Sequence, residues 1–251
     1  MTMRRRSLPW RNFFLNRLSP QGFLGLHLTV GVLLLIGASW LFGGIAEDVM
    51  SGDPLTVVDK HVAEWFHHRT TPRLATAMQV ITGFGSPLWV TGIAVAAGLV
   101  LWRKRCWYRL LVLALVVPGG MALLPLLKMA FHRRRPSFDD AFSIFQGYSF
   151  PSGHTMAATL LYGLLAVFAV QAFGTWRRRA PAVLGALVMV LLVGFSRVCL
   201  GAHYVSDVLG AVAAGSAWLA LSVTAVDALR QSRGRVPGGG DWSIDSVPSQ
   251  H

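Results

Sequence analysis

Apolar positions in this chain fall into six long runs separated by short polar segments. A helix needs about 20 apolar residues to cross a bilayer, and six charge-free runs meet or approach that length: Leu18–Ala46, Leu74–Trp102, Leu110–Leu127, Thr155–Trp176, Ala180–Ser196 and Val208–Val226. The third, fifth and sixth runs are short because Lys128, Arg197 and Asp207 interrupt them. The pattern predicts an all-α, polytopic membrane helix bundle with six transmembrane helices, and these three charged residues at or just inside one membrane face.

The polar segments divide the chain into three parts. Residues 1–20 are predicted to form a basic cytoplasmic N-terminal segment, and residues 21–228 the six-span domain. Residues 229–251 are rich in Gly, Ser and Pro, which predicts a flexible cytoplasmic tail.

The first loop between spans carries an apolar pattern of its own. Val58, Val62, Trp65 and Phe66 follow helical spacing. This spacing predicts a short helix, which either lies on the membrane surface or is buried within the loop.

Composition supports a membrane protein and excludes two other classes. Hydrophobic residues make up 53% of the chain, charged residues only 14%, and the mean hydropathy is +0.51. Such a chain has too little polar surface for a water-soluble globule. The net charge of +12 sits in short clusters between apolar runs, so nucleic acid is not an expected partner. The first apolar run is too long for the h-region of a cleavable signal peptide.

The distribution of basic residues predicts the orientation. Six spans put both termini on one side, where 15 of the 23 Lys and Arg residues would lie. The positive-inside rule therefore places both termini in the cytoplasm of a bacterial inner (plasma) membrane protein. Cys106 and Cys199 then fall at opposite faces, so no disulfide is expected between them. The basic run His132–Arg135 then lies on the extracytoplasmic side, against the positive-inside rule, so its charges need an explanation other than topology.

A histidine and an aspartate near the start of the sixth span form the sharpest chemical signal. His203 and Asp207 are four residues apart, and on a helix such positions share a face. The carboxylate could then fix the imidazole tautomer and leave the other ring nitrogen free to attack. A polar pair that only caps the helix is the alternative. Arg197, just upstream, favours the chemical interpretation because a guanidinium can hold two phosphate oxygens, although a snorkelling arginine is its own alternative.

Two further stretches supply cations and a turn. Lys128 and Arg135 are seven residues apart and would share a helix side if the helix runs that far. The arginines between them, Arg133 and Arg134, have a simpler interpretation as contacts to lipid head groups. In the stretch Pro151–His154, Ser152, Gly153 and the free N–H groups of a helix start could cradle an anion, with His154 beside it to protonate a leaving group.

Taken together, these stretches resemble the type-2 phosphatidic acid phosphatase superfamily of integral-membrane lipid phosphate phosphatases, whose site is shared with vanadium haloperoxidases. The resemblance is carried by three motifs in the expected order and spacing: Lys128-(six residues)-Arg135-Pro136, Pro151-Ser152-Gly153-His154, and Ser196-Arg197-(five)-His203-(three)-Asp207. It extends over roughly residues 20–228 and is specific within the motifs.

The resemblance implies a role for each motif residue. His203 would attack phosphorus and form a phosphohistidine, Asp207 would orient it, and His154 would protonate the leaving group and later deprotonate water. The phosphoryl oxygens would be bound by Lys128, Arg135, Arg197, Ser152 and the Gly153 amide. No metal or cofactor is expected. The expected partners are a lipid phosphate substrate and membrane lipids, and the oligomeric state is left open.

Several substrates and several functions fit this inventory. Phosphatidic acid, phosphatidylglycerol phosphate, undecaprenyl pyrophosphate and lipid A phosphates are candidates, and undecaprenyl pyrophosphate is preferred because the site is predicted to face outward. The alternative function is a lipid-phosphate or anion transporter, which the clustering of the cations at one face disfavours. Six spans argue against a haloperoxidase, and the intact motifs argue against an inactive scaffold.

Overall fold

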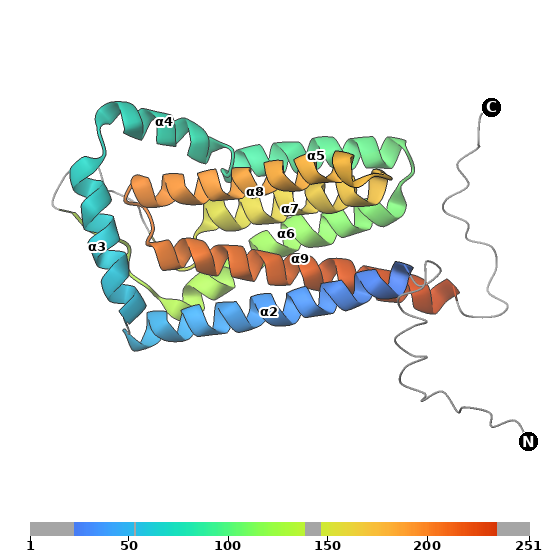
Figure 1. Cartoon of the computed structure of the whole chain (residues 1–251), viewed down its shortest axis with the longest axis horizontal. Helices are drawn as coiled ribbons and strands as arrows, with labels where there is room; N and C mark the ends of the chain where they lie inside the picture. The colour runs from blue at the N-terminus through green and yellow to red at the C-terminus, as the bar shows by residue number, and fades with distance from the viewer. Residues whose placement is uncertain (1–22, 53, 139–146, 235–251) are drawn as a thin grey trace, which may run out of the picture.

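The helix bundle predicted from the sequence is confirmed. The computed structural model describes residues 23–52, 54–138 and 147–234, and within these ranges every regular element is a helix. The helices are α2 (Phe23–Ser51), α3 (Pro54–Arg69), α4 (Pro72–Gly83), α5 (Pro87–Arg103), α6 (Trp107–Phe131), α7 (Gly153–Ala172), α8 (Trp176–Cys199) and α9 (Val205–Gly234). The described part of α2 begins, and that of α9 ends, at the same end of the bundle (Figure 1).

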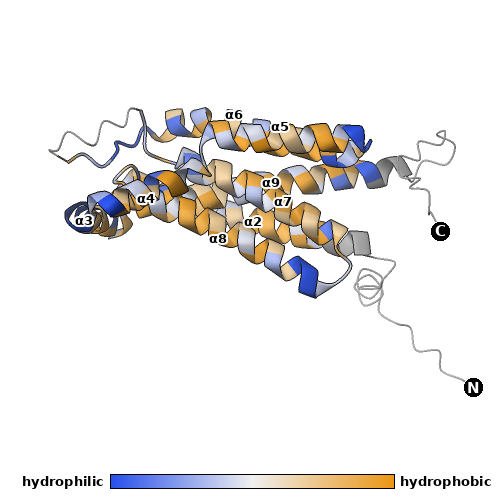
Figure 2. Cartoon of the chain, turned by 90° about the horizontal axis from the view of Figure 1, so that it is seen from above, coloured by the Kyte–Doolittle hydropathy of each residue, from blue (hydrophilic) through white to orange (hydrophobic). Residues whose placement is uncertain are grey.

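The six membrane spans are also confirmed. Six apolar segments of the described chain are long enough to cross a bilayer: Leu28–Ser51, Pro72–Arg103, Trp107–Phe131, Gly153–Ala172, Trp176–Cys199 and Val205–Arg230. Apolar residues cover the lengths of these helices, and polar residues gather toward their ends (Figure 2). The protein is therefore a multi-pass membrane protein. The segment at 1–20 lies outside the described residues, as does the tail beyond Gly234, the last residue of α9.

The second span departs from the prediction, because it is not one continuous helix. The chain breaks between α4 and α5 at Phe84–Ser86. Ser86 caps α5 by accepting a hydrogen bond from the Trp89 N–H at 3.3 Å, and Pro87 follows at the first helical position, where its missing N–H costs nothing. Gly85 lets the break pack closely against α7, since a Cβ there would lie 2.8 Å from the His154 carbonyl oxygen.

Helix α7 occupies the centre of the bundle, packed against α6, α8 and α9 (Figure 1). Its side chains Met156, Leu160, Leu161 and Leu164 are fully buried. Small residues let the neighbouring helices approach, because a Cβ at Gly120 would lie 2.4 Å from the Leu160 side chain. The start of α7 carries site residues, so this packing fixes their position.

Helix α3 lies across one end of the bundle (Figure 1) and confirms the helix predicted in the first loop. Its inner face overlaps the predicted one only in part, since Val62 and Phe66 are partly buried. Asp59 and Ala63 are buried, whereas Val58 and Trp65 are about half exposed. A carboxylate therefore faces the bundle from this helix, which the apolar spacing did not predict.

Candidate active site

The three motif stretches come together at the end of the bundle that α3 crosses. The first covers the end of α6 and the segment after it, and the second covers the residues before α7 and its first two residues. The third runs from the end of α8 through the turn into the start of α9 (Figure 1). These stretches are far apart in the sequence, so the six-helix topology alone brings them to one place.

The first stretch ends a helix and continues without regular secondary structure. His132 terminates α6 in the left-handed conformation (φ 47°), and residues 132–138 form no helix. Lys128 and Arg135 therefore do not share a helix side; the helix that this expectation required stops at Phe131. Both side chains instead bind the stretch before α7: Lys128 Nζ donates to the Tyr148 carbonyl at 2.9 Å, and Arg135 Nε to the Gly147 carbonyl at 3.1 Å.

The third stretch is a tight turn stabilised by Arg197. The Arg197 carbonyl accepts hydrogen bonds from the N–H groups of Ala202 (3.1 Å) and His203 (3.3 Å). Gly201 adopts φ 64° within the turn, a conformation that favours glycine. Because α9 begins at Val205, His203 lies before the helix rather than on it. The predicted pairing of His203 with Asp207 is present. His203 is placed by the loop between α8 and α9, and Asp207 by the first turn of α9.

The His203 ring lies between an acid and a cation. Nδ1 is 3.4 Å from Asp207 Oδ2, and Nε2 is 3.3 Å from Nη1 of Arg135. The same Nη1 donates to the Ala202 carbonyl at 2.9 Å, which holds Arg135 against the turn. His203 is 2% exposed and Asp207 is fully buried. With Nδ1 as the donor to Asp207, Nε2 carries the lone pair and is the nitrogen next to the Arg135 guanidinium.

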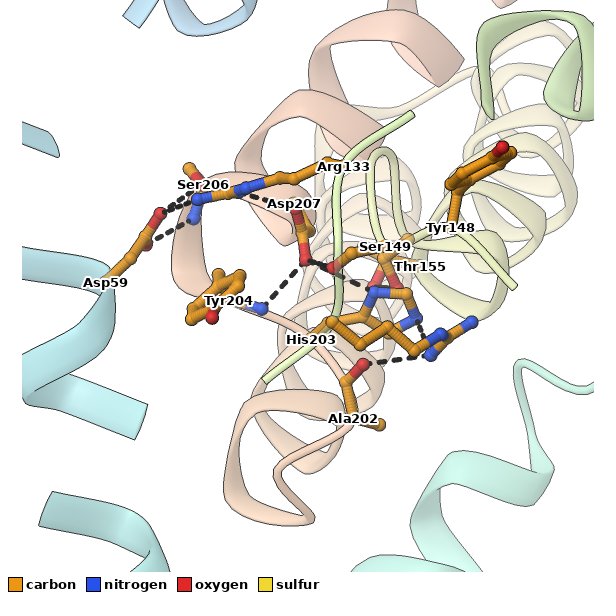
Figure 3. Close-up of polar contacts among 12 residues, drawn as sticks. Asp59, Arg133, Tyr148, Ser149, Thr155, Ala202, His203, Tyr204, Ser206 and Asp207 are labelled. Atoms are coloured by element: carbon orange, nitrogen blue, oxygen red, sulfur yellow. Dashed lines mark hydrogen bonds and ion pairs between the residues drawn. The ribbon is translucent and has the colours of Figure 1, made fainter. Parts of the chain in front are cut away.

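Asp207 is held by several donors besides His203. Its Oδ2 accepts the Tyr204 N–H at 2.9 Å and the Ser149 hydroxyl, and its Oδ1 accepts Nη1 of Arg133 at 2.7 Å (Figure 3). Hydrogen bonds of this kind favour a carboxylate in its ionised form. The two oxygens thus have separate partners, since Oδ2 faces the histidine and Oδ1 faces an arginine.

The second stretch abuts the third. The Ser152 N–H donates to the Asp207 carbonyl at 3.0 Å, and the Ser152 hydroxyl accepts from Thr155 at 3.0 Å, which leaves its own hydrogen available to another acceptor. Gly153 and His154 open α7, whose first N–H groups have no acceptor within the helix. His154 is partly buried and lies within electrostatic reach of His203.

The remaining predicted cations line the same region. Arg197 is 6% exposed, its Nη1 donates to the Thr82 hydroxyl on α4 at 3.2 Å, and it lies within electrostatic reach of Arg135. Lys128 is likewise within reach of Arg135 and Arg197. All eight predicted site residues therefore belong to the three stretches that converge at this end of the bundle.

Burial shapes the charge states at the centre of the site. It lowers the pKa of His203 to about 4, against the opposing effect of Asp207, so the ring is neutral at pH 7. Burial also lowers the pKa of Arg135. Burial alone would lower the pKa of Arg133, but the carboxylates of Asp207 and Asp59 outweigh it and raise that pKa. The site thus pairs a neutral imidazole with charged guanidinium groups.

Sequence reasoning missed a buried group on the far side of Asp207. Arg133 is not a head-group contact: its Nη2 donates to Asp59 Oδ2 on α3 at 2.8 Å. Ser206 completes the group, donating its N–H to Asp59 Oδ1 at 3.0 Å. One signal was available, because Asp59 shares a helix face with Val62, Ala63 and Phe66, and a carboxylate on an apolar face needs a buried partner.

Known proteins are similar to this chain in sequence and in fold. Residues 107–231 match the PAP2 superfamily. A phosphatidylglycerophosphatase B of Bacillus subtilis (strain 168) is 37% identical over 147 residues, which cover 57% of this chain and 71% of that protein. A lipid A 1-phosphatase of Rhizobium johnstonii is 32% identical over 170 residues, covering 57% of this chain and 64% of that protein.

A solved structure extends the likeness beyond the matched segment. The crystal structure of a transmembrane PAP2 type phosphatidylglycerolphosphate phosphatase from Bacillus subtilis superposes with a TM-score of 0.69 at 26% identity, covering 81% of this chain and 98% of that one. The motif order, the converged geometry and these likenesses agree with the resemblance seen in the sequence. The chain belongs to the PAP2 superfamily.

Proposed function

We propose that the protein is a membrane phosphatase that hydrolyses the phosphomonoester or pyrophosphate of a lipid through a phosphohistidine intermediate at His203. The observation that carries the proposal is the position of the His203 ring, with Nδ1 facing Asp207 and Nε2 facing Arg135. A neutral imidazole with one nitrogen oriented by a carboxylate and the other beside a phosphate-binding cation has the arrangement of an activated nucleophile.

The reaction divides into two displacements. In the first, His203 Nε2 forms a bond to phosphorus while the bond from phosphorus to the lipid oxygen breaks, and protonated His154 gives its proton to the departing oxygen. In the second, neutral His154 takes a proton from water as the water oxygen attacks phosphorus and the phosphorus–nitrogen bond breaks. The products are the dephosphorylated lipid and inorganic phosphate, and both histidines return to their starting forms.

Cationic side chains take the part that a metal plays in other phosphatases. Lys128, Arg135 and Arg197, with Ser152 and the first N–H groups of α7, would bind the phosphoryl oxygens as negative charge builds up in the transition state. One cation about 4 Å from such an oxygen contributes roughly 4 kcal/mol at an effective dielectric near 20. Several such contacts give the reaction a metal-independent route.

The substrate class follows from the position of the site. The site lies at the ends of apolar helices. A lipid bound there would present its head group to the site, with its chains between the helices. Two of the similar proteins, one from Bacillus subtilis and one from Haemophilus influenzae, carry the name phosphatidylglycerophosphatase B. Phosphatidylglycerol phosphate is therefore the first substrate to test, ahead of phosphatidic acid, lipid A phosphates and undecaprenyl pyrophosphate. By the charge count of the loops, the site opens on the extracytoplasmic side.

The test is phosphate release by the purified protein in lipid nanodiscs, with kcat/KM compared over these four lipids. A brief reaction with ³²P-labelled substrate should leave an acid-labile, alkali-stable label on the protein, as expected for phosphohistidine. His203→Asn should lose the label and about 10³-fold or more in kcat. His61→Asn, at an exposed histidine on α3, is the matched control and should retain both. Phosphate release by His203→Asn at the wild-type rate would reject the nucleophile assignment.

A further inference from the structure

Arg133 lies between two buried carboxylates that belong to different helices. Its Nη1 is 2.7 Å from Asp207 Oδ1, and its Nη2 is 2.8 Å from Asp59 Oδ2, with the arginine side chain 12% exposed and both carboxylates fully buried. Ser206 links the group, since its hydroxyl accepts from Arg133 Nη1 at 2.5 Å and donates to Asp59 (Figure 3). The Tyr204 ring covers the guanidinium, whose Cζ lies 4.4 Å from the ring centroid.

The charges in this group alternate toward the candidate nucleophile. Asp59 is negative, Arg133 positive and Asp207 negative, and next comes the neutral ring of His203. If Asp59 were absent, one arginine would face one aspartate, and the pair would present little net charge to His203. With Asp59 present, the three groups together carry one negative charge. Asp207 Oδ2 is the oxygen of this group that faces the His203 ring.

We infer that Asp59 and Arg133 are positioning residues for His203. Arg133 fixes the orientation of Asp207, and Asp59 offsets the charge of Arg133 so that Asp207 still acts on the ring as an anion. The inference rests on the proposed function, because the imidazolium that needs this anion is the one that forms when Nε2 binds phosphorus. Asp59 thereby makes α3 part of the catalytic apparatus, although the side chain does not touch the substrate.

A purely structural role for Asp59 gives a different expectation. If the carboxylate only docks α3 onto the start of α9, through its contacts with Arg133 and Ser206, then removing both Asp59 and Arg133 should damage the protein more than removing Asp59 alone. Charge compensation predicts the reverse, since removing a balanced pair restores the negative charge at Asp207. A double variant therefore separates the two roles.

The kinetic experiment compares Asp59→Asn with Asp59→Asn/Arg133→Gln in nanodiscs, where glutamine keeps a donor for Asp207. Asp59→Asn should lower kcat and the single-turnover rate of phosphoenzyme formation by about tenfold or more, the size of effect that loss of an outer-shell partner has at metal sites. KM should change little, because Asp59 does not bind substrate. The double variant should regain at least about threefold in kcat. Glu64→Gln removes an exposed charge from the same helix and should match the wild type.

A second measurement needs no substrate. Ring-¹⁵N NMR at about pH 4.5 reports the protonated fraction of His203, which should fall in Asp59→Asn and return toward the wild-type value in the double variant. The inference is overturned if all three proteins give the same fraction, or if the double variant is less active than Asp59→Asn. A wild-type protein that forms no phosphoenzyme would contradict the proposed function. The protonated fractions of His203 in the three proteins would still decide the role of Asp59.

Discussion

Nη1 of Arg135 lies 3.3 Å from Nε2 of His203, the ring nitrogen opposite the one that faces Asp207. The guanidinium is held in place by the Ala202 and Gly147 carbonyls, so the contact does not depend on a bound anion. A phosphate that binds Arg135 would meet the histidine lone pair directly. In the proposed reaction, the phosphate-binding group and the nucleophile would therefore be adjacent before substrate binds, which would reduce the rearrangement that the first step needs.

The first prediction concerns the protonation of His203. Burial lowers its pKa to about 4, whereas an exposed histidine titrates near 6.5. The ring should therefore stay neutral as the pH falls from 7 to about 5. The unfolded chain takes up this proton at about pH 6.5, so the residue lowers the free energy of unfolding as the pH drops from about 6.5 toward 4.

Ring-¹⁵N NMR of the histidine-labelled protein measures this directly, with His203→Asn used to assign the signal. A midpoint near 4 is expected. A midpoint at or above 6.5 would show that the ring is not desolvated in the way that its 2% exposure indicates.

The second prediction concerns Gly85, where the second span breaks. An added Cβ would lie 2.5 Å from the Val193 side chain and 2.8 Å from the His154 carbonyl oxygen, so Gly85→Ala should displace the start of α7. Overpacking of this kind destabilises by about 1–3 kcal/mol, and kcat should fall because His154 moves. Thermal unfolding and phosphate release measure the two effects.

The control for Gly85→Ala is Gly92→Ala, on the same span, where nothing lies within 4 Å of an added Cβ. This variant should be as stable and as active as the wild type or slightly more stable, since alanine favours a helix over glycine. Equal behaviour of the two variants would mean that the break does not position His154.

The convergence of the three motifs was predictable, and the local geometry that achieves it was not. Apolar runs and their interrupting charges define the spans, and the parity of the spans puts Lys128, Arg197 and Asp207 at one end. The ending of α6 at Phe131 depends on His132 in a left-handed conformation, which few side chains adopt and no spacing indicates. The close approach of Gly85 to the His154 carbonyl is a tertiary contact, which no local pattern indicates.

The role of Arg133 was beyond sequence reasoning for a similar reason. Three consecutive arginines, Arg133 to Arg135, look alike in the sequence. In the structure the first lies between two acids, the third lies beside His203, and Arg134 is exposed. Only their partners distinguish them. Asp59 was the one available signal, as a carboxylate on the apolar face of a predicted helix.

The third prediction concerns metals. Because Lys128, Arg135 and Arg197 supply the positive charge in the proposed reaction, phosphate release should be unchanged after treatment with EDTA and dialysis. The measurement is kcat before and after treatment, with added Mg²⁺ as a comparison. A strict requirement for a divalent ion would reject the proposed role of these side chains.

The fourth prediction concerns orientation. Ser137 is exposed at the end of the molecule that carries the site, and Gly174, between α7 and α8, is exposed at the other end. In a protein with Cys106→Ser and Cys199→Ser, Ser137→Cys should react with a membrane-impermeant thiol reagent added to intact cells. Gly174→Cys should react only after lysis. The opposite pattern would reverse the proposed topology.

The docking of α3 through Asp59 determines which shortened versions of the chain can keep the site intact. A fragment bounded by the family match, residues 107–231, would retain all three motifs. It would also strip Arg133 of one of its two carboxylates, remove the Thr82 hydroxyl that binds Arg197, and delete the glycine that abuts the His154 carbonyl. Truncations, chimaeras and grafts of this phosphatase scaffold should therefore keep the helices before residue 107. The segment that matches the family is shorter than the part of the chain that holds the site residues in place.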